Sequence, residues 1–411
     1  MIINFITFAS ILQKKSAIKK FHESILKELE KHFTIRFIDY TEIHKLSETD
    51  FKIIFIATGG VEKLIVQCYE NLPRPTVLLA DGMQNSLAAA LEVSSWLRNR
   101  GLKNEILHGE IDPIIERIHT LYSNFSAQQA LKGTRVGVMG TPSSWLIASN
   151  VDYLLAKRRW EVEYIDISLD CIYEEFNNIS DDEVGQSCAN FASKALACRE
   201  ASPEDLIKGM RLYKAIKNIC EKEQLKALTL SCFKIIEQIG TTGCLALALL
   251  NDEGIIAGCE GDLQSIFTLL AVQAITGKTG FMANPSMINA KNKEVVFAHC
   301  TIPIKMTQQY IIRNHFETES GVGIQGIMPT GEVTVIKCGG ECLDEYYVSS
   351  GILIENTNYI NMCRTQVRIK LNNTTDYFLK NSLGNHHIII QGNYENAIHN
   401  FLHANSCKRV E

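Results

Sequence analysis

The sequence predicts an α/β protein built from two parallel α/β sandwich domains followed by a C-terminal antiparallel β-barrel-like domain. Three observations predict this order. Apolar strand-like runs alternate with helical patterns from residue 1 to about residue 130, and the alternation restarts after a polar segment. From about residue 301 the runs become short and β-branched, with Gly, Asn and Pro turns between them. We therefore expect domains at residues 1–130, 131–300 and 301–411.

The first domain has the pattern of a flavodoxin-like parallel sheet. Its strand-like runs are IINFITF, IRFIDY, KIIFIAT and PTVLLA, and segments of helical period follow them. The opening segment MIINFITFASILQKK carries its charges after the apolar run, whereas a secretory signal carries them before it. The opening run is therefore predicted to be the first strand.

The second domain begins with RVGVMG, the helical pattern SSWLIASNVDYLLAKR and the strand-like EVEYIDI. After a mostly helical stretch, strand-like runs return at ALTLSCF, GIIAGC, KTGFMA and EVVFAHC, which we expect to extend the parallel sheet. The last domain carries the runs GVGIQGIM, EVTVIKC, CRTQVRIKL and HHIIIQG and ends in the helical pattern YENAIHNFLHA. An antiparallel barrel or sheet closed by a final helix is predicted there.

The composition argues against several classes of partner. The 411 residues are 46% hydrophobic, and 41 basic residues stand against 46 acidic ones, for a net charge of −5. No basic block or aromatic-interleaved Lys/Arg stripe is present, so no nucleic-acid partner is expected. No run reaches the roughly 18 apolar residues of a membrane helix, so no membrane partner is expected. The 13 scattered cysteines, without a C-x-x-C pair, predict buried thiols in a reducing, cytoplasmic setting.

Three successive strand-like runs of the second domain end on side chains that can bind a metal: Glu260, Asn284 and His299. If these strands are neighbours in an open α/β sheet, their carboxyl ends meet at one crevice. A fourth ligand is expected from the late run LGNHHIII, as either His386 or His387. Carboxylate, amide oxygen and imidazole together suit Mn²⁺ or Mg²⁺ better than a thiophilic ion.

Each of these residues also has a structural interpretation. Glu260 and Asp262 precede the helical pattern LQSIFTLLAVQAI, where acids are favoured in the first turn. Asn284 precedes Pro285 and is compatible with a turn. A histidine at the end of an apolar strand is commonly a structural residue. The spacing alone leaves these alternatives open.

The segments CEGDLQSIFTLLAVQAITGKTGFMAN, FAHC and GNHHIIIQGN resemble the active-site region of the L-fucose isomerase and L-arabinose isomerase superfamily. The resemblance covers roughly residues 225–300 and 380–395. That family interconverts aldoses and ketoses at a divalent metal. The resemblance therefore implies a sugar substrate, Mn²⁺ or Mg²⁺ as cofactor, and a homo-oligomer that is a trimer or hexamer. It implies four metal ligands, namely Glu260, Asn284, His299 and His386.

The chain departs from the family at the second acid, which is Asn284 here. An amide can bind a cation through its oxygen but cannot accept a proton at neutral pH. The family mechanism moves a proton between adjacent carbons with carboxylates, so Glu260 is the family-matched carboxylate that remains. Asp262 is a candidate for the missing acid or base, and we therefore expect Glu260 and Asp262 to be catalytic.

Two further residues are candidates for binding the sugar. Trp145, next to Ser144, is expected to line a sugar pocket, because aromatic faces stack on the C–H surfaces of sugars; packing in the core is the alternative. His315 is a candidate for moving a proton, with Glu317 or Glu319 to orient it, and a structural role is its alternative.

The leading hypothesis is thus an intramolecular oxidoreductase that interconverts aldoses and ketoses by an ene-diol mechanism. Two rival functions remain. One is a different reaction at the same metal, such as epimerisation or aldol cleavage, to which the loss of an acid is an adaptation. The other is a sugar-binding or regulatory protein without catalysis.

Overall fold

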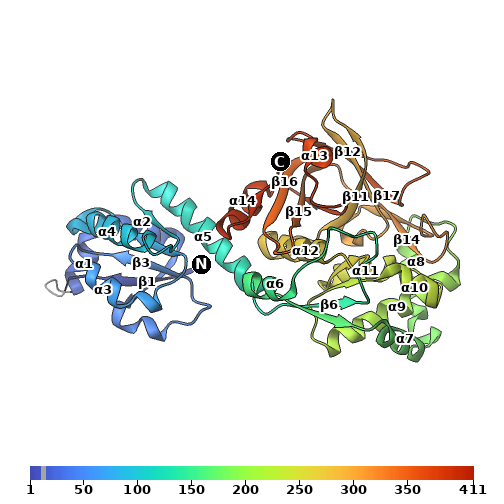
Figure 1. Ribbon diagram of the computed structural model, residues 1–411, viewed down its shortest axis with the longest axis horizontal. Helices are drawn as coiled ribbons and strands as arrows, with labels where there is room; N and C mark the ends of the chain where they lie inside the picture. Colours follow the sequence, from blue (N-terminus) through green and yellow to red (C-terminus); the bar gives the residue numbers. More distant parts are fainter. Residues whose placement is uncertain (11–14) are drawn as a thin grey trace. The chain divides into compact units, whose positions relative to one another are not determined.

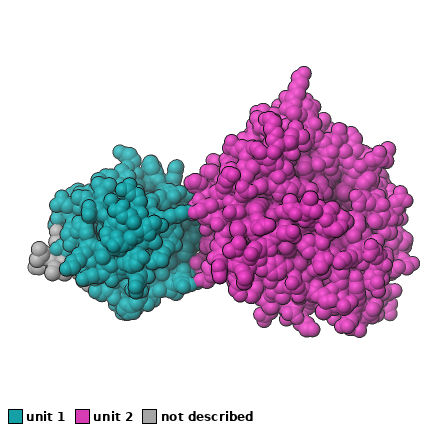
Figure 2. All heavy atoms as spheres, in the orientation of Figure 1, with its two compact units in different colours: residues 1–125 teal, residues 126–411 magenta. Residues whose placement is uncertain are grey.

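The computed structural model describes residues 1–10 and 15–411, which form two compact units. Unit 1 comprises residues 1–125 and unit 2 comprises residues 126–411 (Figure 2). Both are mixed α/β structures, and unit 2 also contains a closed six-stranded antiparallel barrel. The predicted fold class is therefore confirmed. Within the described residues, no helix is long and apolar enough to span a membrane.

Unit 1 contains a five-stranded parallel sheet in the order β2-β1-β3-β4-β5, the flavodoxin-like order. Side chains alternate along its strands, so that Phe5 and Phe55 pack on one face while Ile6 and Ile54 pack on the other. Helices α2 and α5 cover the first face, and α3 and α4 cover the second. Figure 1 labels these helices around the strands of unit 1. The strands are β1 (Ile2–Phe8), β2 (Thr34–Asp39), β3 (Lys52–Ile56), β4 (Thr76–Leu79) and β5 (Asn104–Leu107). The helices are α1 (Lys15–Phe21), α2 (Glu23–His32), α3 (Glu62–Gln67), α4 (Ser86–Arg98) and α5 (Ile111–Leu131), which continues into unit 2.

Unit 2 begins with a four-stranded parallel sheet in the order β10-β9-β6-β7. Its strands are β6 (Arg135–Met139), β7 (Glu163–Ile167), β9 (Ala227–Leu230) and β10 (Ile256–Cys259). The helices around it are α6 (Tyr153–Trp160), α7 (Leu169–Asn178), α8 (Asp181–Lys194), α9 (Pro203–Lys222), α10 (Cys232–Ile239), α11 (Cys244–Glu253) and α12 (Leu263–Thr276). Helix α12 is buried over most of its length, and it packs against both β10 and the barrel strand β15. The parallel sheet and the barrel therefore share one hydrophobic core.

The barrel closes because β15 pairs with both β18 and β16. Its strands are β11 (Phe281–Asn289), β12 (Glu294–His299), β15 (Gly331–Gly339), β16 (Glu345–Asn356), β17 (Thr365–Leu371) and β18 (His387–Gln391). The short β19 (Lys408–Arg409) pairs in parallel with β16. Helix α13 (Asp376–Lys380) lies between β17 and β18 along the chain, and helix α14 (Glu395–Ala404) follows β18. A separate three-stranded sheet contains β8 (Ala197–Cys198), β13 (Gln309–Arg313) and β14 (Gly323–Ile327). Helix α14 matches the final helix predicted from the sequence.

The expectation that KTGFMA and EVVFAHC extend the parallel sheet is wrong. These runs form β11 and β12, which pair antiparallel with each other inside the barrel. Strand β11 also continues beyond Asn284 to Asn289, with an irregular register between Pro285 and Met287. Proline lacks the N–H that a regular ladder needs, so it is accommodated where the pairing shifts.

The predicted helix SSWLIASNVDYLLAKR forms only in its second half. Helix α6 begins at Tyr153, and Asp152 caps it by accepting hydrogen bonds from the backbone N–H groups of Leu154 and Leu155 at 2.9 Å. Residues 141–151 precede this cap without helical structure. Trp145 is therefore on a loop, which leaves its side chain available to residues outside its own segment.

A tight turn follows β10 and places two acids. Glu260 has φ of 64° and Gly261 has φ of 72°, and Asp262 then caps α12. Left-handed backbone is unusual for a residue with a side chain and is found where surrounding structure holds it in place. Here the loop at residues 141–152 does so: the N–H of Ser143 donates to the carbonyl of Glu260 at 2.9 Å. A Cβ on Gly261 would lie 2.7 Å from Cα of Pro142.

We expect Gly261→Ala to destabilise unit 2 more than Gly277→Ala does. Gly277 also has a positive φ, of 67°, but open space where a Cβ would be. Its substitution should cost only the left-handed backbone, about 1–2 kcal/mol. Gly261→Ala should cost roughly 1–3 kcal/mol more, because Pro142 must move. Urea unfolding of both variants measures the difference, and equal losses of stability would refute the close contact.

Candidate metal centre

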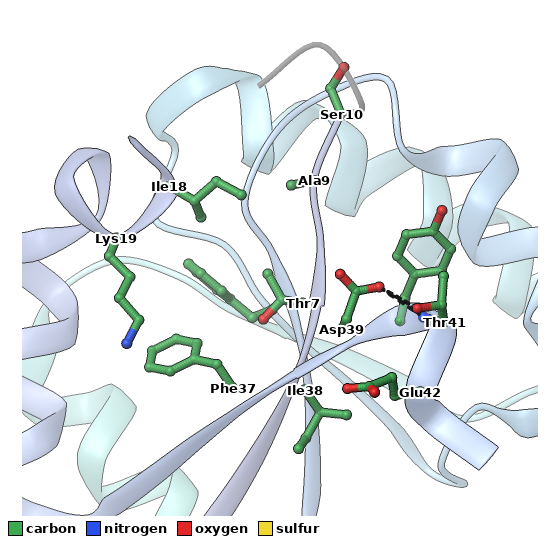
Figure 3. A pocket seen from close by; sticks show the side chains of 12 residues that line it. Thr7, Ala9, Ser10, Ile18, Lys19, Phe37, Ile38, Asp39, Thr41 and Glu42 are labelled. Carbon is green, nitrogen blue, oxygen red and sulfur yellow. Dashed lines mark hydrogen bonds between the residues drawn. The ribbon is translucent and has the colours of Figure 1, made fainter. Parts of the chain in front are cut away.

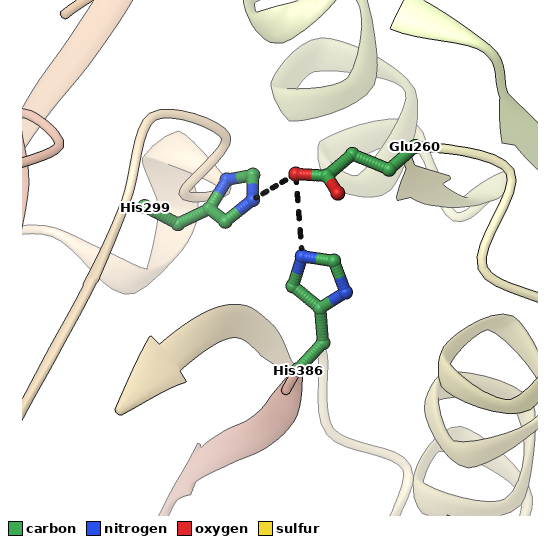
Figure 4. A group of neighbouring side chains, drawn as sticks. All are labelled: Glu260, His299 and His386. Atoms are coloured by element: carbon green, nitrogen blue, oxygen red, sulfur yellow. Dashed lines mark ion pairs between the residues drawn. The ribbon is translucent and has the colours of Figure 1, made fainter. Parts of the chain in front are cut away.

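A carboxylate and two imidazoles converge in unit 2. Glu260 comes from the turn after β10, His299 from the end of β12, and His386 from the residue before β18 (Figure 4). One potential ligand atom from each lies within 4.8 Å of the others. Oε1 of Glu260 is 3.4 Å from Nε2 of His386 and 3.9 Å from Nε2 of His299. The structure thus brings together three of the four residues predicted to bind a metal.

The barrel register explains how residues distant in sequence meet here. Strands β18, β11 and β12 are neighbours, with His387 opposite Ala283 and Asn284 opposite Ala298. His386 directly precedes His387, and His299 directly follows Ala298. Measured along the strands, both histidines therefore lie within one residue of Asn284. Antiparallel pairing in the barrel brings these side chains together, whereas the sequence analysis attributed their meeting to the ends of parallel strands.

His386 rather than His387 belongs to the cluster. Successive side chains on a strand point in opposite directions, and His387 accordingly places its Nε2 3.0 Å from the hydroxyl of Tyr377. Its ring packs among aromatic residues, and burial lowers its pKa to about 3. His387 is thus a neutral residue of the barrel core.

The outer nitrogens of both clustered histidines are engaged. Nδ1 of His386 donates to Oδ2 of Asp262 at 2.9 Å, and Nδ1 of His299 lies 3.0 Å from the hydroxyl of Thr301. These contacts turn the Nε2 atoms of both rings toward Glu260. A metal-binding histidine needs such a partner at its other nitrogen, because that partner fixes the ring and the tautomer.

Asp262 is fully buried and has several partners. It accepts hydrogen bonds from the backbone N–H and the hydroxyl of Ser265, both at 2.8 Å, and so caps α12. The ammonium of Lys337, also fully buried, lies 3.6 Å from Asp262 and donates to the Ser265 hydroxyl at 2.8 Å. The capping alternative for Asp262 is therefore confirmed. Its catalytic role stays a prediction, since its carboxylate is turned toward His386, Ser265 and Lys337.

The charges of the cluster are strongly coupled. Burial opposes ionisation of Glu260, but His299 and His386 outweigh this effect and hold its pKa well below the usual range. Burial likewise opposes a charge on His386, yet Asp262 and Glu260 together raise its pKa to about 9. Burial lowers the pKa of His299. The carboxylates of Glu260 and Asp262 are thus balanced by Lys337 and by the positive charge on His386, which contacts both acids.

Two buried polar atoms at the cluster have no hydrogen-bond partner among the described residues. They are Nε2 of His386 and Oδ1 of Asn284. Unsatisfied buried polar atoms are rare in native proteins and often mark a missing ion or water. When the imidazole of His386 is neutral, its Nε2 offers a lone pair to a cation, as do Oδ1 of Asn284 and the carboxylate of Glu260. The donor set therefore fits a divalent metal.

A small cavity of about 50 Å³ adjoins the cluster. Glu260, Asn284 and His299 line it, together with His315 and Glu317 from the turn after β13. The remaining lining residues are Phe233, Ile236, Thr242 and the cysteines Cys232, Cys244, Cys259, Cys300 and Cys363. All 13 cysteines are free thiols. The structure thus brings His315 to the same cavity as the cluster.

Trp145 reaches the cluster from the loop at residues 141–152. Its indole Nε1–H donates to Oε2 of Glu260 at 2.7 Å, and its ring packs edge-on against Phe233 at 5.0 Å between centroids. The side chain is 51% exposed, so its other surface is open to solvent. Its predicted role in sugar binding stays a prediction, whereas its hydrogen bond to Glu260 was not foreseen from the sequence.

A larger cavity, of about 650 Å³, lies in unit 1 at the carboxyl ends of β1 and β2 (Figure 3). Phe37 and Phe55 line it, and the ammonium of Lys19 lies 4.4 Å from the centre of the Phe37 ring. In the described part of the chain, the group of His, Cys, Asp and Glu side chains suited to a metal is at Glu260. The side chains suited to a metal are therefore at the smaller cavity, which is the candidate functional site.

Comparison with known proteins gives one informative similarity. The chain is 23% identical over 194 residues to the sulfoquinovose isomerase of Clostridium sp. (strain MSTE9). The match covers 46% of this chain and 43% of that protein, so it spans less than half the length of the relative. No protein-family model matches the chain. The resemblance to L-fucose and L-arabinose isomerases stays a prediction.

We expect Asp262→Ala to cost about 3–5 kcal/mol of unfolding free energy, because it leaves the buried ammonium of Lys337 without its carboxylate. Asp152→Ala, which removes the exposed cap of α6, should cost only about 1 kcal/mol. Chemical denaturation of both variants measures the contrast. Similar losses for the two would show that Asp262 acts only as a helix cap.

Proposed function

We propose that this chain is a metal-dependent sugar isomerase that interconverts an aldose and its ketose. The observation that carries the proposal is the convergence of Glu260, His299 and His386 on one point beside a cavity. The similarity to a sulfoquinovose isomerase supports the same reaction class. That similarity comes from a sequence comparison over 194 residues, whereas the convergence comes from side-chain geometry.

The residues that would hold the metal are Glu260, His299 and His386, with Asn284 as a fourth ligand through its amide oxygen. Two imidazoles and a carboxylate suit a transition-metal ion, while Mg²⁺ prefers oxygen ligands and water. The donor set therefore favours Mn²⁺ over Mg²⁺. The cysteines that line the cavity do not form a group of three with each other, so a zinc–thiolate site is not supported within the described residues.

A divalent cation supplies a Lewis acid that polarises the carbonyl and the adjacent hydroxyl of a sugar. The chain's own residues hold the site in place for that task. Trp145 fixes one oxygen of Glu260, and Asp262 and Thr301 fix the two imidazoles. The surrounding apolar side chains and thiols limit the entry of water, which strengthens the electrostatic interactions inside the cavity.

Metal binding should depend on His386 and not on its neighbour. We expect His386→Gln to weaken Mn²⁺ binding by more than the roughly 10–100-fold that loss of an outer partner costs, because it removes a direct ligand. His387→Gln is the matched control and should bind Mn²⁺ like the wild type. Isothermal titration of the metal-free proteins gives both affinities. Equal affinities of all three proteins would reject the metal centre.

Isomerase activity should require the metal. With Mn²⁺, the protein should convert at least one aldose of a panel containing sulfoquinovose, L-fucose and L-arabinose into its ketose. Chelation should abolish the conversion, and Mn²⁺ should restore it. Product analysis by NMR separates this outcome from its rivals: an epimer or cleavage fragments would identify another reaction at the metal. Sugar binding without turnover would identify a non-catalytic protein.

A further inference from the structure

We propose that Glu317 is the carboxylate that moves the proton between the two reacting carbons of the sugar. This inference rests on the proposed isomerase function and assigns it a catalytic residue. It starts from a requirement of the chemistry. An aldose becomes a ketose when a proton leaves one carbon and returns to its neighbour, which needs a group that can accept and donate it.

The acids of the cluster itself are already committed to other contacts. One oxygen of Glu260 faces the two histidines, and the other accepts the indole N–H of Trp145. The carboxylate of Asp262 is turned away, toward His386, Ser265 and Lys337. The amide of Asn284 cannot accept a proton at neutral pH. The proton acceptor must therefore come from another part of the cavity wall.

Among the histidines and acids that line the cavity, His315 and Glu317 remain. Nδ1 of His315 lies 3.1 Å from the hydroxyl of Thr318, and burial lowers the pKa of His315 to about 4, which makes it a weak base. Glu317 lines the same cavity and carries a carboxylate, and the residue is exposed to solvent. Of the two residues, Glu317 is the stronger candidate.

The cavity is small enough to place a reacting atom against both carboxylates. Its volume of about 50 Å³ corresponds to one or two water molecules. The reacting end of a sugar that enters it therefore lies in a space lined by both Glu317 and Glu260, while the rest of the sugar stays outside. A base must lie within hydrogen-bond reach of the proton it removes, and this confinement provides that reach.

The turn that carries Glu317 is held from both sides. Within the turn, the N–H of His315 donates to the carbonyl of Ser320, and the N–H of Glu319 donates to the carbonyl of His315, both at 3.1 Å. On one side, the hydroxyl of Thr242 donates to the carbonyl of Val322 at 2.7 Å.

On the other side, Nε of Arg364 donates to the carbonyl of Asn314 at 3.0 Å. Gly321, with φ of 59°, allows the close approach to Thr242, since a Cβ there would lie 2.7 Å from the Thr242 nitrogen. These contacts hold the backbone that carries Glu317 in place before the substrate arrives.

The proton transfer balances without an added reactant. Glu317 takes the proton from C2 of the aldose, and the electron pair of that C–H bond forms the C1=C2 double bond while the carbonyl oxygen on C1 receives the proton of the neighbouring C2 hydroxyl, which leaves an enediolate. Glu317 then returns its proton to C1, and the electron pair of the enediolate oxygen forms the C=O bond of the ketone at C2. The carboxylate of Glu317 is ionised again at the end of the reaction.

The test compares Glu317→Gln with Glu237→Gln, an exposed residue on α10 that does not line the cavity. We expect Glu317→Gln to lower kcat by at least about 100-fold, the lower end of what general acid–base catalysis contributes. KM and Mn²⁺ affinity should stay within about threefold of the wild type. Glu237→Gln should be as active as the wild type, and Glu317→Asp should recover part of kcat because it restores a carboxylate.

Exchange of the sugar's C–H with deuterated solvent provides a second readout, which Glu317→Gln should suppress together with turnover. A wild-type-like kcat for Glu317→Gln would overturn the inference and leave the isomerase function standing. A loss confined to Mn²⁺ affinity would also overturn it, because Glu317 would then act on the metal site. A wild-type protein that neither isomerises nor exchanges any sugar would overturn the proposed function and this inference together.

Discussion

The buried carboxylate of Asp262 is the contact on which the centre depends. It joins the start of α12, which packs on the parallel sheet, to His386, which precedes a barrel strand. A buried anion is tolerated only when charges and donors compensate it, and Ser265, His386 and Lys337 do so here. One side chain thereby sets the helix start, the ring orientation of His386 and the relation between the two sheets of unit 2.

The sequence predicted the fold class well, because alternating strand and helix patterns are strong local signals. The strands of unit 1 and the final helix α14 lie where those patterns indicated. The assignment of β11 and β12 to the parallel sheet failed for a physical reason. A strand buried on both faces reads as a continuous apolar run in a parallel sheet and in a packed barrel alike. Which strand it pairs with depends on the tertiary structure and not on the local sequence.

The site was predicted less completely. Glu260, His299 and His386 meet as expected, although the roles of these residues stay proposals. The choice between His386 and His387 depends on strand register, which two adjacent histidines do not reveal. Lys337 and Thr301 have no motif around them, and their importance comes from contacts to Asp262 and His299 across the fold. For Glu317, the local signal was only its closeness in sequence to His315.

The hydrogen bond between Trp145 and Glu260 couples the outer loop to the inner ligand. The indole is half exposed at one end of this bond, and the carboxylate is nearly buried at the other. A ligand that displaced the indole would therefore also free an oxygen of Glu260, and a ligand that moved this carboxylate would release the indole. If two ligands act on the two ends of this bond, each changes the affinity of the other by the same factor. Movement of the Trp145 loop and binding at Glu260 would thus be coupled through this one hydrogen bond.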